Sequence, residues 1–90
     1  TKAADQGYAE AQYKLGHMYE NGYGVVKNNI EAIKLYSKAA DQGFAGAQNN
    51  LGFMYMNGYG VDKNYEEAVN LYTKAADQGL AIAQYNLGYM

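Results

Sequence analysis

The sequence predicts an all-α fold, built as an array of 36-residue helix-turn-helix repeats. Three short stretches that return at this spacing lead to the prediction: Ala-Ala-Asp-Gln-Gly at 3–7, 39–43 and 75–79, Leu-Gly at 15–16, 51–52 and 87–88, and Asn-Gly-Tyr-Gly-Val at 21–25 and 57–61. A fixed period between about 20 and 50 residues is typical of stacked repeats, in which each unit buries its apolar side against its neighbours.

The repeat units follow from aligning the chain with itself. Residues 8–43 and 44–79 are identical at 24 of 36 positions. We therefore predict a single repeat array over 1–90, which divides into the end of a truncated repeat (1–7), two full repeats (8–43 and 44–79) and the first helix of another truncated repeat (80–90). Because both outer units are partial, we expect either a piece of a longer array or ends that neighbouring chains complete.

Each full repeat is predicted to contain a helix A and a helix B, joined by a glycine-containing connection. We place helix A at 8–20, 44–56 and 80–90, and helix B at 29–41 and 65–77. Asn28 and Asn64 precede helix B, each with a glutamate three residues later, and this is a capping pattern in which the asparagine satisfies a free amide. Gly43 and Gly79 follow helix B, where a residue with positive φ commonly ends a helix.

Apolar stripes predict which helix faces are buried. Helix B has apolar residues at offsets that cover one face of a helix: Ala32, Leu35, Tyr36, Ala39 and Ala40, repeated as Ala68, Leu71, Tyr72, Ala75 and Ala76. Helix A has a similar stripe: Ala11, Leu15, Met18 and Tyr19, repeated as Ala47, Leu51, Met54 and Tyr55.

Recurring small and polar residues of helix A predict how the helices touch. Glycine inside a helix costs about 0.5–1 kcal/mol relative to alanine, so its recurrence predicts a close approach to the alanines of helix B: Gly16, Gly52 and Gly88. Glutamine also recurs, which predicts structural hydrogen bonds: Gln12, Gln48 and Gln84. An apolar residue stands at each start of helix A, so we expect Asp41 or Gln42 to cap the helix that follows.

The composition argues against several function classes. A net charge of −2 and a pI near 5.2 provide no basic surface for nucleic acid or an anionic membrane. No apolar run approaches the roughly 20 residues that span a bilayer. The chain has no cysteine, and His17, its single histidine, has no second histidine or triad partner in the pattern. We therefore expect no catalytic, cofactor or metal site.

The combined motifs resemble the Sel1-like repeats, relatives of the tetratricopeptide repeats, over the whole chain. The resemblance depends on Ala-Ala-x-x-Gly between repeats, on Leu15, Gly16 and Tyr19 in helix A, and on the Gly-x-Gly-Val connection at 22–25. The 36-residue unit favours this family over the tetratricopeptide version, whose period is 34. The resemblance implies a right-handed α/α superhelix that acts as a non-catalytic scaffold or adaptor for other proteins.

Comparison between repeats predicts where a partner binds. Positions that differ between repeats are free to serve something other than the fold, and in helix A they fall on one face. In solenoids of this type the A helices line the concave surface, so we expect a protein or an extended peptide to bind there. This A-helix face consists of Glu10, Tyr13, Lys14, His17, Asn49, Asn50, Phe53, Met56, Tyr85, Asn86 and Tyr89.

Several alternatives to this interpretation remain open. The A-helix face could be an ordinary solvated surface that tolerates change. Helix B has a second variable stripe, from Ile30 to Ser37 and from Glu66 to Thr73, which we assign to the convex side. Uncapped terminal repeats could also stack head-to-tail into oligomers or filaments. An enzyme would need a convergent acid–base pair, which the sequence does not suggest.

Overall fold

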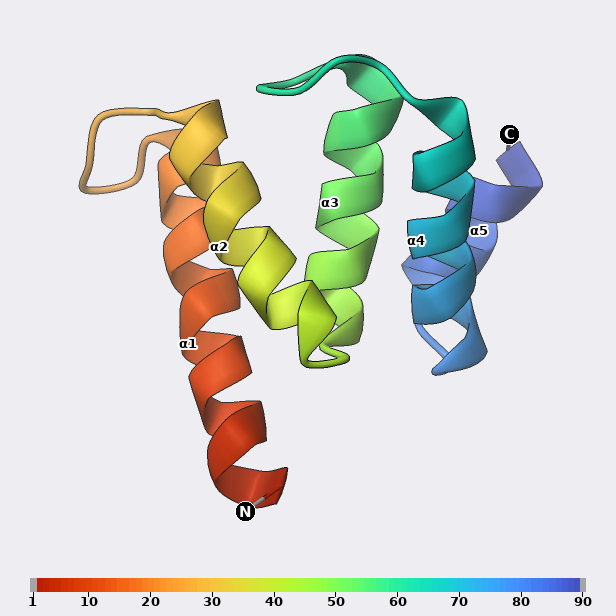
Figure 1. Cartoon of the computed structure of the whole chain (residues 1–90), viewed down its shortest axis with the longest axis horizontal. Coiled ribbons are helices and arrows are strands. Elements are labelled where there is room, and N and C mark those ends of the chain that lie inside the picture. Colours follow the sequence, from red (N-terminus) through yellow and green to blue (C-terminus); the bar gives the residue numbers. More distant parts are fainter. Residues whose placement is uncertain (1, 90) are drawn as a thin grey trace.

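The computed structural model contains five helices in an α-solenoid: α1 (Lys2–Asn21), α2 (Asn29–Asp41), α3 (Ala45–Asn57), α4 (Tyr65–Asp77) and α5 (Ala81–Tyr89). The structure describes the backbone of residues 2–89 and the side chains of residues 8–88. Each helix packs on the next one along the chain, and successive helices run in opposite directions (Figure 1). None of the helices in the described part of the chain is long and apolar enough to cross a membrane.

The boundaries of helix B confirm the predicted capping. The side chains of Asn28 and Asn64 accept hydrogen bonds from the amides of Glu31 and Glu67, at 3.1 and 3.0 Å. At the other end Gly43 adopts φ +86°. Its amide and that of Phe44 bond to the carbonyls of Ala40 and Ala39, which is the Schellman arrangement that lets the chain turn directly into the next helix.

One predicted joint does not form. Residues 3–7 have the same five letters as 39–43, yet α1 continues from Lys2 to Asn21 without a break. No earlier helix in the described part of the chain packs back against residues 8–21. Without such packing the local preference for continuing the helix prevails, although an interior glycine costs about 1 kcal/mol.

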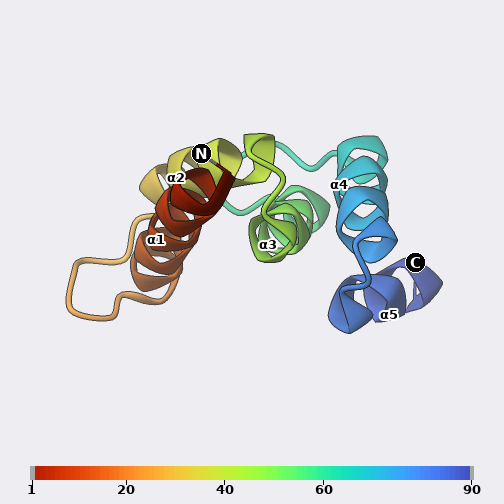
Figure 2. The same ribbon diagram turned by 90° about the horizontal axis from the view of Figure 1, so that it is seen from below.

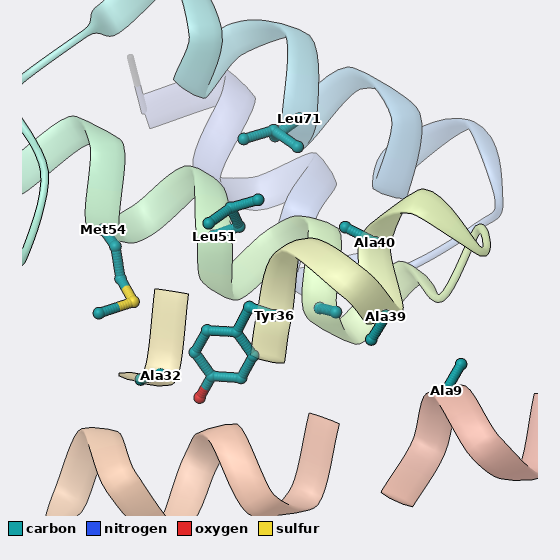
Figure 3. Close-up of a cluster of buried hydrophobic side chains, with 9 residues drawn as sticks. Ala9, Ala32, Tyr36, Ala39, Ala40, Leu51, Met54 and Leu71 are labelled. Atoms are coloured by element: carbon teal, nitrogen blue, oxygen red, sulfur yellow. The ribbon is translucent and has the colours of Figure 1, made fainter. Parts of the chain in front are cut away.

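The core confirms the stripe of helix B. It includes Tyr36 and three alanines of α2 (Figure 3): Ala32, Ala39 and Ala40. Ala47 of α3 belongs to the same core. In helix A of the second repeat Leu51 and Met54 are only 5% and 0% exposed. The equivalent Leu15 and Met18 of α1 are 40% and 37% exposed, and Ala11 is exposed as well. The stripe prediction is therefore wrong for Ala11, Leu15 and Met18, because the described residues place no helix B on that side of α1, whereas Tyr19 packs against the core as predicted.

The recurring glycines do mark close approaches to helix B: at Gly52 the alanine predicted to face it is near, since a Cβ there would lie 3.3 Å from the carbonyl oxygen of Ala68, but the nearest group at Gly16 and Gly52 is a tyrosine ring. A Cβ on Gly16 would lie 2.9 Å from the ring of Tyr36, and one on Gly52 would lie 3.1 Å from the ring of Tyr72. Glycine therefore makes room for the tyrosine ring of helix B in the same repeat. A Cβ on Gly88 would meet no described atom within 4 Å, since α5 is followed by no helix B.

The recurring glutamines form the predicted bridges. Gln42 donates to the side-chain oxygen of Gln12 at 2.7 Å, and Gln78 donates to that of Gln48 at 2.9 Å. Gln48 also donates to the carbonyl of Ala40. Because the Gln42 side chain is occupied in this way, it does not cap α3. No side chain makes a cap bond at Phe44, the N-cap of α3, so the capping prediction is wrong.

Candidate functional site

The A-helix face lies on one side of the molecule. Figure 2 shows α1, α3 and α5 along one layer and α2 and α4 along the other, with α3 set back between α1 and α5. The variable positions of helix A therefore come from three helices that share one side of a curved array. Two open pockets occur on them, one between α3 and α5 and one on α1.

The pocket between α3 and α5 brings four predicted residues together. Its volume is about 400 Å³, and it is lined by Phe53, Met56, Tyr85 and Asn86, together with Asn57 and Tyr72. The last two were missed by sequence reasoning, because both residues are identical in the first repeat and so carried no sign of variation. A glycine equivalent to Gly52 recurs in every repeat, and the Tyr72 ring packs against Gly52, so the recurrence of this glycine could have indicated where Tyr72 lies.

The pocket on α1 is a separate hollow of about 370 Å³. It is lined by three predicted residues, Tyr13, Lys14 and His17, and by Met18, which we had assigned to the buried stripe. Lys14 forms an exposed ion pair with Glu10 at 3.3 Å. An exposed pair four residues apart on a helix contributes only about 0.3–0.5 kcal/mol, so both side chains remain available to a partner.

Aromatic rings follow the A-helix face in small groups. The ring of Tyr13 lies 5.1 Å from that of Phe44 and 5.8 Å from that of Tyr36. His17 and Tyr23 are 5.9 Å apart, and Phe53 and Tyr59 repeat this pair at the same distance. Tyr13 is thus partly a packing residue between repeats. The other two pairs place rings from the connections beside the helix.

The asparagines of the A-helix face bond mainly to one another. Asn86 donates to Asn49 at 3.0 Å, Asn49 donates to Asn50 at 3.3 Å, and Asn50 donates to the hydroxyl of Tyr36 at 3.2 Å. Asn49 is only 6% exposed. This network joins α5, α3 and α2, so Asn49 holds the repeats together and offers little surface to a ligand. Its sequence position alone could not indicate this burial.

The two buried tyrosines of the B helices differ at their hydroxyls. Tyr36 donates to a carboxylate oxygen of Glu20 at 2.6 Å. Burial, reinforced by this bond to Glu20, raises the pKa of Tyr36 well above its ordinary value, while the bond from Asn50 acts against that shift. Burial also raises the pKa of Tyr72. No residue in the described part of the chain makes a hydrogen bond to the Tyr72 hydroxyl.

Tyr89 lies outside the residues whose side chains the structure describes. Among the described residues, no group of three or more His, Cys, Asp or Glu side chains is placed to hold a metal ion. The chemistry that the face does offer is aromatic rings, amides, one imidazole and one Lys–Glu pair, which suits recognition of a peptide.

Comparison with known proteins places this geometry in a family. The Sel1 repeat model matches residues 9–44, 45–80 and 81–90, so its units begin one residue later than those predicted from the internal alignment. No curated protein sequence matches the chain.

Solved structures show the same fold at high similarity. A Sel1 repeat protein from Oxalobacter formigenes is 49% identical over 90% of this chain, with a TM-score of 0.88. A protective antigen of uropathogenic Escherichia coli with an SLR fold is 39% identical over 97% of the chain, with a TM-score of 0.88. Helicobacter pylori cysteine rich protein B is 34% identical over 88% of the chain, with a TM-score of 0.82.

The chain spans only part of each of these proteins: 33% of the Oxalobacter protein, 19% of the Escherichia antigen and 59% of the Helicobacter protein. Unlike the Helicobacter protein, which is described as cysteine rich, this chain has no cysteine, so no disulfide joins its repeats. With matched repeats over 9–90 and the same helical solenoid, the chain belongs to the Sel1 repeat family.

Proposed function

We propose that this chain is a protein-interaction module that binds an extended peptide segment along the A-helix face. Sel1 repeats are generally protein–protein interaction scaffolds and are typically non-catalytic, which supports the class of function. The observation that supports this particular surface is the pocket between α3 and α5, at whose mouth Phe53 and Tyr85 are 42% and 70% exposed.

Exposed rings on helices are suited to binding. An aromatic ring has few rotatable bonds, so fixing it on binding costs little conformational entropy for a large apolar contact. Phe53 belongs to α3 and Tyr85 to α5, and the bond from Asn86 to Asn49 fixes these two helices to each other. A peptide would therefore meet two rings whose spacing is already set before it binds.

The test is the double variant Phe53→Ala with Tyr85→Ala. Neither side chain is in the buried core, so helicity and thermal unfolding should stay the same while partner affinity falls at least tenfold. The partner is first isolated by affinity capture, and a peptide from it is then titrated against both proteins. The matched control is Ile30→Ala with Tyr65→Ala, two exposed apolar residues of the B helices. Equal loss of affinity in both double variants would contradict the A-helix face.

A second candidate function is self-association through the open face of α1. Leu15 and Met18 are exposed there, whereas the equivalent Leu51 and Met54 are covered by a neighbouring repeat. A helix B from another copy would cover them and so extend the array. Light scattering over a range of concentrations tests this, since a monomer at all concentrations would exclude it. In an associating chain, Leu15→Glu should restore the monomer.

A further inference from the structure

Tyr36 and Tyr72 occupy the same position in the two repeats, but only Tyr36 has partners for its hydroxyl. Both rings are buried against an interior glycine of helix A. The Tyr36 hydroxyl donates to Glu20 and accepts from Asn50. The Tyr72 hydroxyl has no hydrogen bond to any residue in the described part of the chain. The two sites therefore share a tyrosine ring packed on a glycine, and they differ in the hydrogen-bond partners of the hydroxyl.

The difference follows from two positions of helix A. Where the first repeat has Glu20, the second has Met56, whose thioether is a weak acceptor. Where Asn50 faces Tyr36, the equivalent Asn86 donates instead to Asn49. Tyr72 thus loses both partners at once. In their place an open pocket of about 400 Å³ is bordered by Tyr72, Met56 and Asn86.

Among the described residues no fully buried side-chain oxygen or nitrogen lacks a hydrogen-bond partner, so the Tyr72 hydroxyl, which has none, is open to solvent through the pocket. Tyr72 is only 1% exposed, yet it lines this open pocket, so a ligand can reach it. Phenolic oxygen is both a donor and an acceptor, but at neutral pH it keeps its proton and its strongest bonds are to anionic oxygens. The pocket therefore offers this donor to an acceptor from outside the chain, and in the first repeat the acceptor at the equivalent position is the Glu20 carboxylate.

We propose that the Tyr72 pocket binds the carboxylate of a glutamate side chain from the partner peptide, which accepts a hydrogen bond from Tyr72 as Glu20 does from Tyr36. This inference rests on the proposed function, since it names the residue that the peptide presents at one point of the A-helix face. The methylene groups of the glutamate pack against Phe53, Met56 and Tyr85. No lysine or arginine lines the pocket, and none is needed in the first repeat, where Glu20 has no ion pair among the described residues and stays partly hydrated.

The experiment uses two pools of blocked heptapeptides that differ only at the central residue, glutamate in one and glutamine in the other. Binding is followed by ¹H–¹³C NMR of the Met56 methyl group and the Tyr72 ring in the full chain. The glutamate pool should move both signals with an apparent Kd at least fivefold below that of the glutamine pool. Tyr72→Phe should abolish this preference and leave the weaker binding of the glutamine pool unchanged.

Two further variants place at each position the residue that the other repeat has there. Met56→Glu supplies the carboxylate from the chain itself, so it should prevent binding of the glutamate pool at Tyr72. Glu20→Met should create a second glutamate-preferring site, seen at the Tyr36 ring. Both positions lie partly exposed near the end of helix A, and circular dichroism checks that each variant keeps its helices.

The outcomes separate this inference from the proposed function. Equal affinity of the two pools at Tyr72 would overturn the glutamate assignment and leave peptide binding intact. Shifts at Tyr13 and His17 without shifts at Met56 or Tyr72 would also overturn it, because the peptide would then bind elsewhere on the A-helix face. The absence of any shift would overturn both proposals. Failure of Glu20→Met to create a second site would show that the two tyrosines are not equivalent.

Discussion

The repeat made of α1 and α2 and the repeat made of α3 and α4 have nearly the same backbone signals and different surroundings. Each begins helix B at a capping asparagine, ends it at a glycine with positive φ, and places a tyrosine ring over a helix A glycine. The first repeat leaves the apolar side of its helix A uncovered but completes the bonds of its tyrosine. The second covers its helix A and leaves its tyrosine hydroxyl facing a pocket.

This difference separates two tasks within one repeat. Residues that are the same in both units set the shape of the array, since they form caps, turns and close contacts. Residues that differ decide whether the tyrosine hydroxyl bonds to a side chain of the chain itself, as Tyr36 does to Glu20, or faces a pocket, as Tyr72 does beside Met56. The closed and the open site differ by one substitution in helix A, Glu20 against Met56, and by the partner of an asparagine that is the same in both, since Asn50 donates to Tyr36 and Asn86 donates to Asn49.

The largest predicted contrast concerns the same leucine in the two repeats. Leu51→Ala should destabilise the chain by about 2–5 kcal/mol, because it removes a buried side chain and leaves a cavity. Leu15→Ala should cost less than about 1 kcal/mol, because Leu15 is already 40% exposed. Urea unfolding followed by circular dichroism measures both.

A loss below about 0.5 kcal/mol for Leu51→Ala would show that the register of helix A is wrong, because a buried leucine cannot be truncated so cheaply. A large loss for Leu15→Ala would point to a dimer in solution that covers α1. Repeating the Leu15→Ala measurement at several protein concentrations distinguishes a dimer from a folding effect, since only association makes stability depend on concentration.

A smaller contrast is expected at the two tyrosines. Tyr36→Phe removes a short hydrogen bond to a carboxylate, and bonds to charged groups contribute about 1.5–3 kcal/mol. Because Glu20 is partly exposed and can be rehydrated, we expect a loss of about 1.5 kcal/mol. Tyr72→Phe should change the free energy of unfolding by less than about 0.5 kcal/mol, since no described partner is lost.

Equal losses at the two positions would contradict the comparison. They would mean that the Tyr72 hydroxyl has a partner in solution, such as a bound water. Glu20→Gln is the matched control for the first site, because it keeps the shape and removes the charge. Its stability should fall between that of the parent and that of Tyr36→Phe.

The sequence predicted those features that depend on one helix and its own ends. The cap of Asn28, the glycine at 43 and the buried face from Ala32 to Ala40 are all local patterns that the period repeats. The prediction failed where a missing neighbour decides the outcome. Ala11, Leu15 and Met18 of α1 are exposed and the joint at 3–7 is absent because the described residues include no helix B that packs on that side of α1.

The lining of the candidate pocket was predictable only in part, for a related reason. Variation between repeats identified Phe53, Met56, Tyr85 and Asn86, which do line one pocket. It could not identify Tyr72, whose identity is constant while its surroundings change. It also included Asn49, which is buried, because the direction of an amide is set by bonds to other helices that no single-helix pattern contains.

The last prediction is a loss of stability at alkaline pH. Burial raises the pKa of Tyr36 and of Tyr72 above the ordinary value of 10.0. Above pH 10 the unfolded chain therefore loses these two protons while the folded chain keeps them, so stability is full below pH 10 and falls as pH rises beyond it. Each tyrosine contributes at most about 1.4 kcal/mol per pH unit.

Urea unfolding between pH 9 and 11 measures this loss. The free energy of unfolding should fall less steeply with pH for Tyr36→Phe than for Tyr72→Phe, because the bond to Glu20 adds to the pKa shift of Tyr36 alone. Parallel curves for parent and both variants would mean that other groups, such as the lysines, cause the loss. In that case the hydroxyls of Tyr36 and Tyr72 would be hydrated to the same extent. The difference between a bonded hydroxyl at Tyr36 and a hydroxyl facing a pocket at Tyr72 would then not hold in solution.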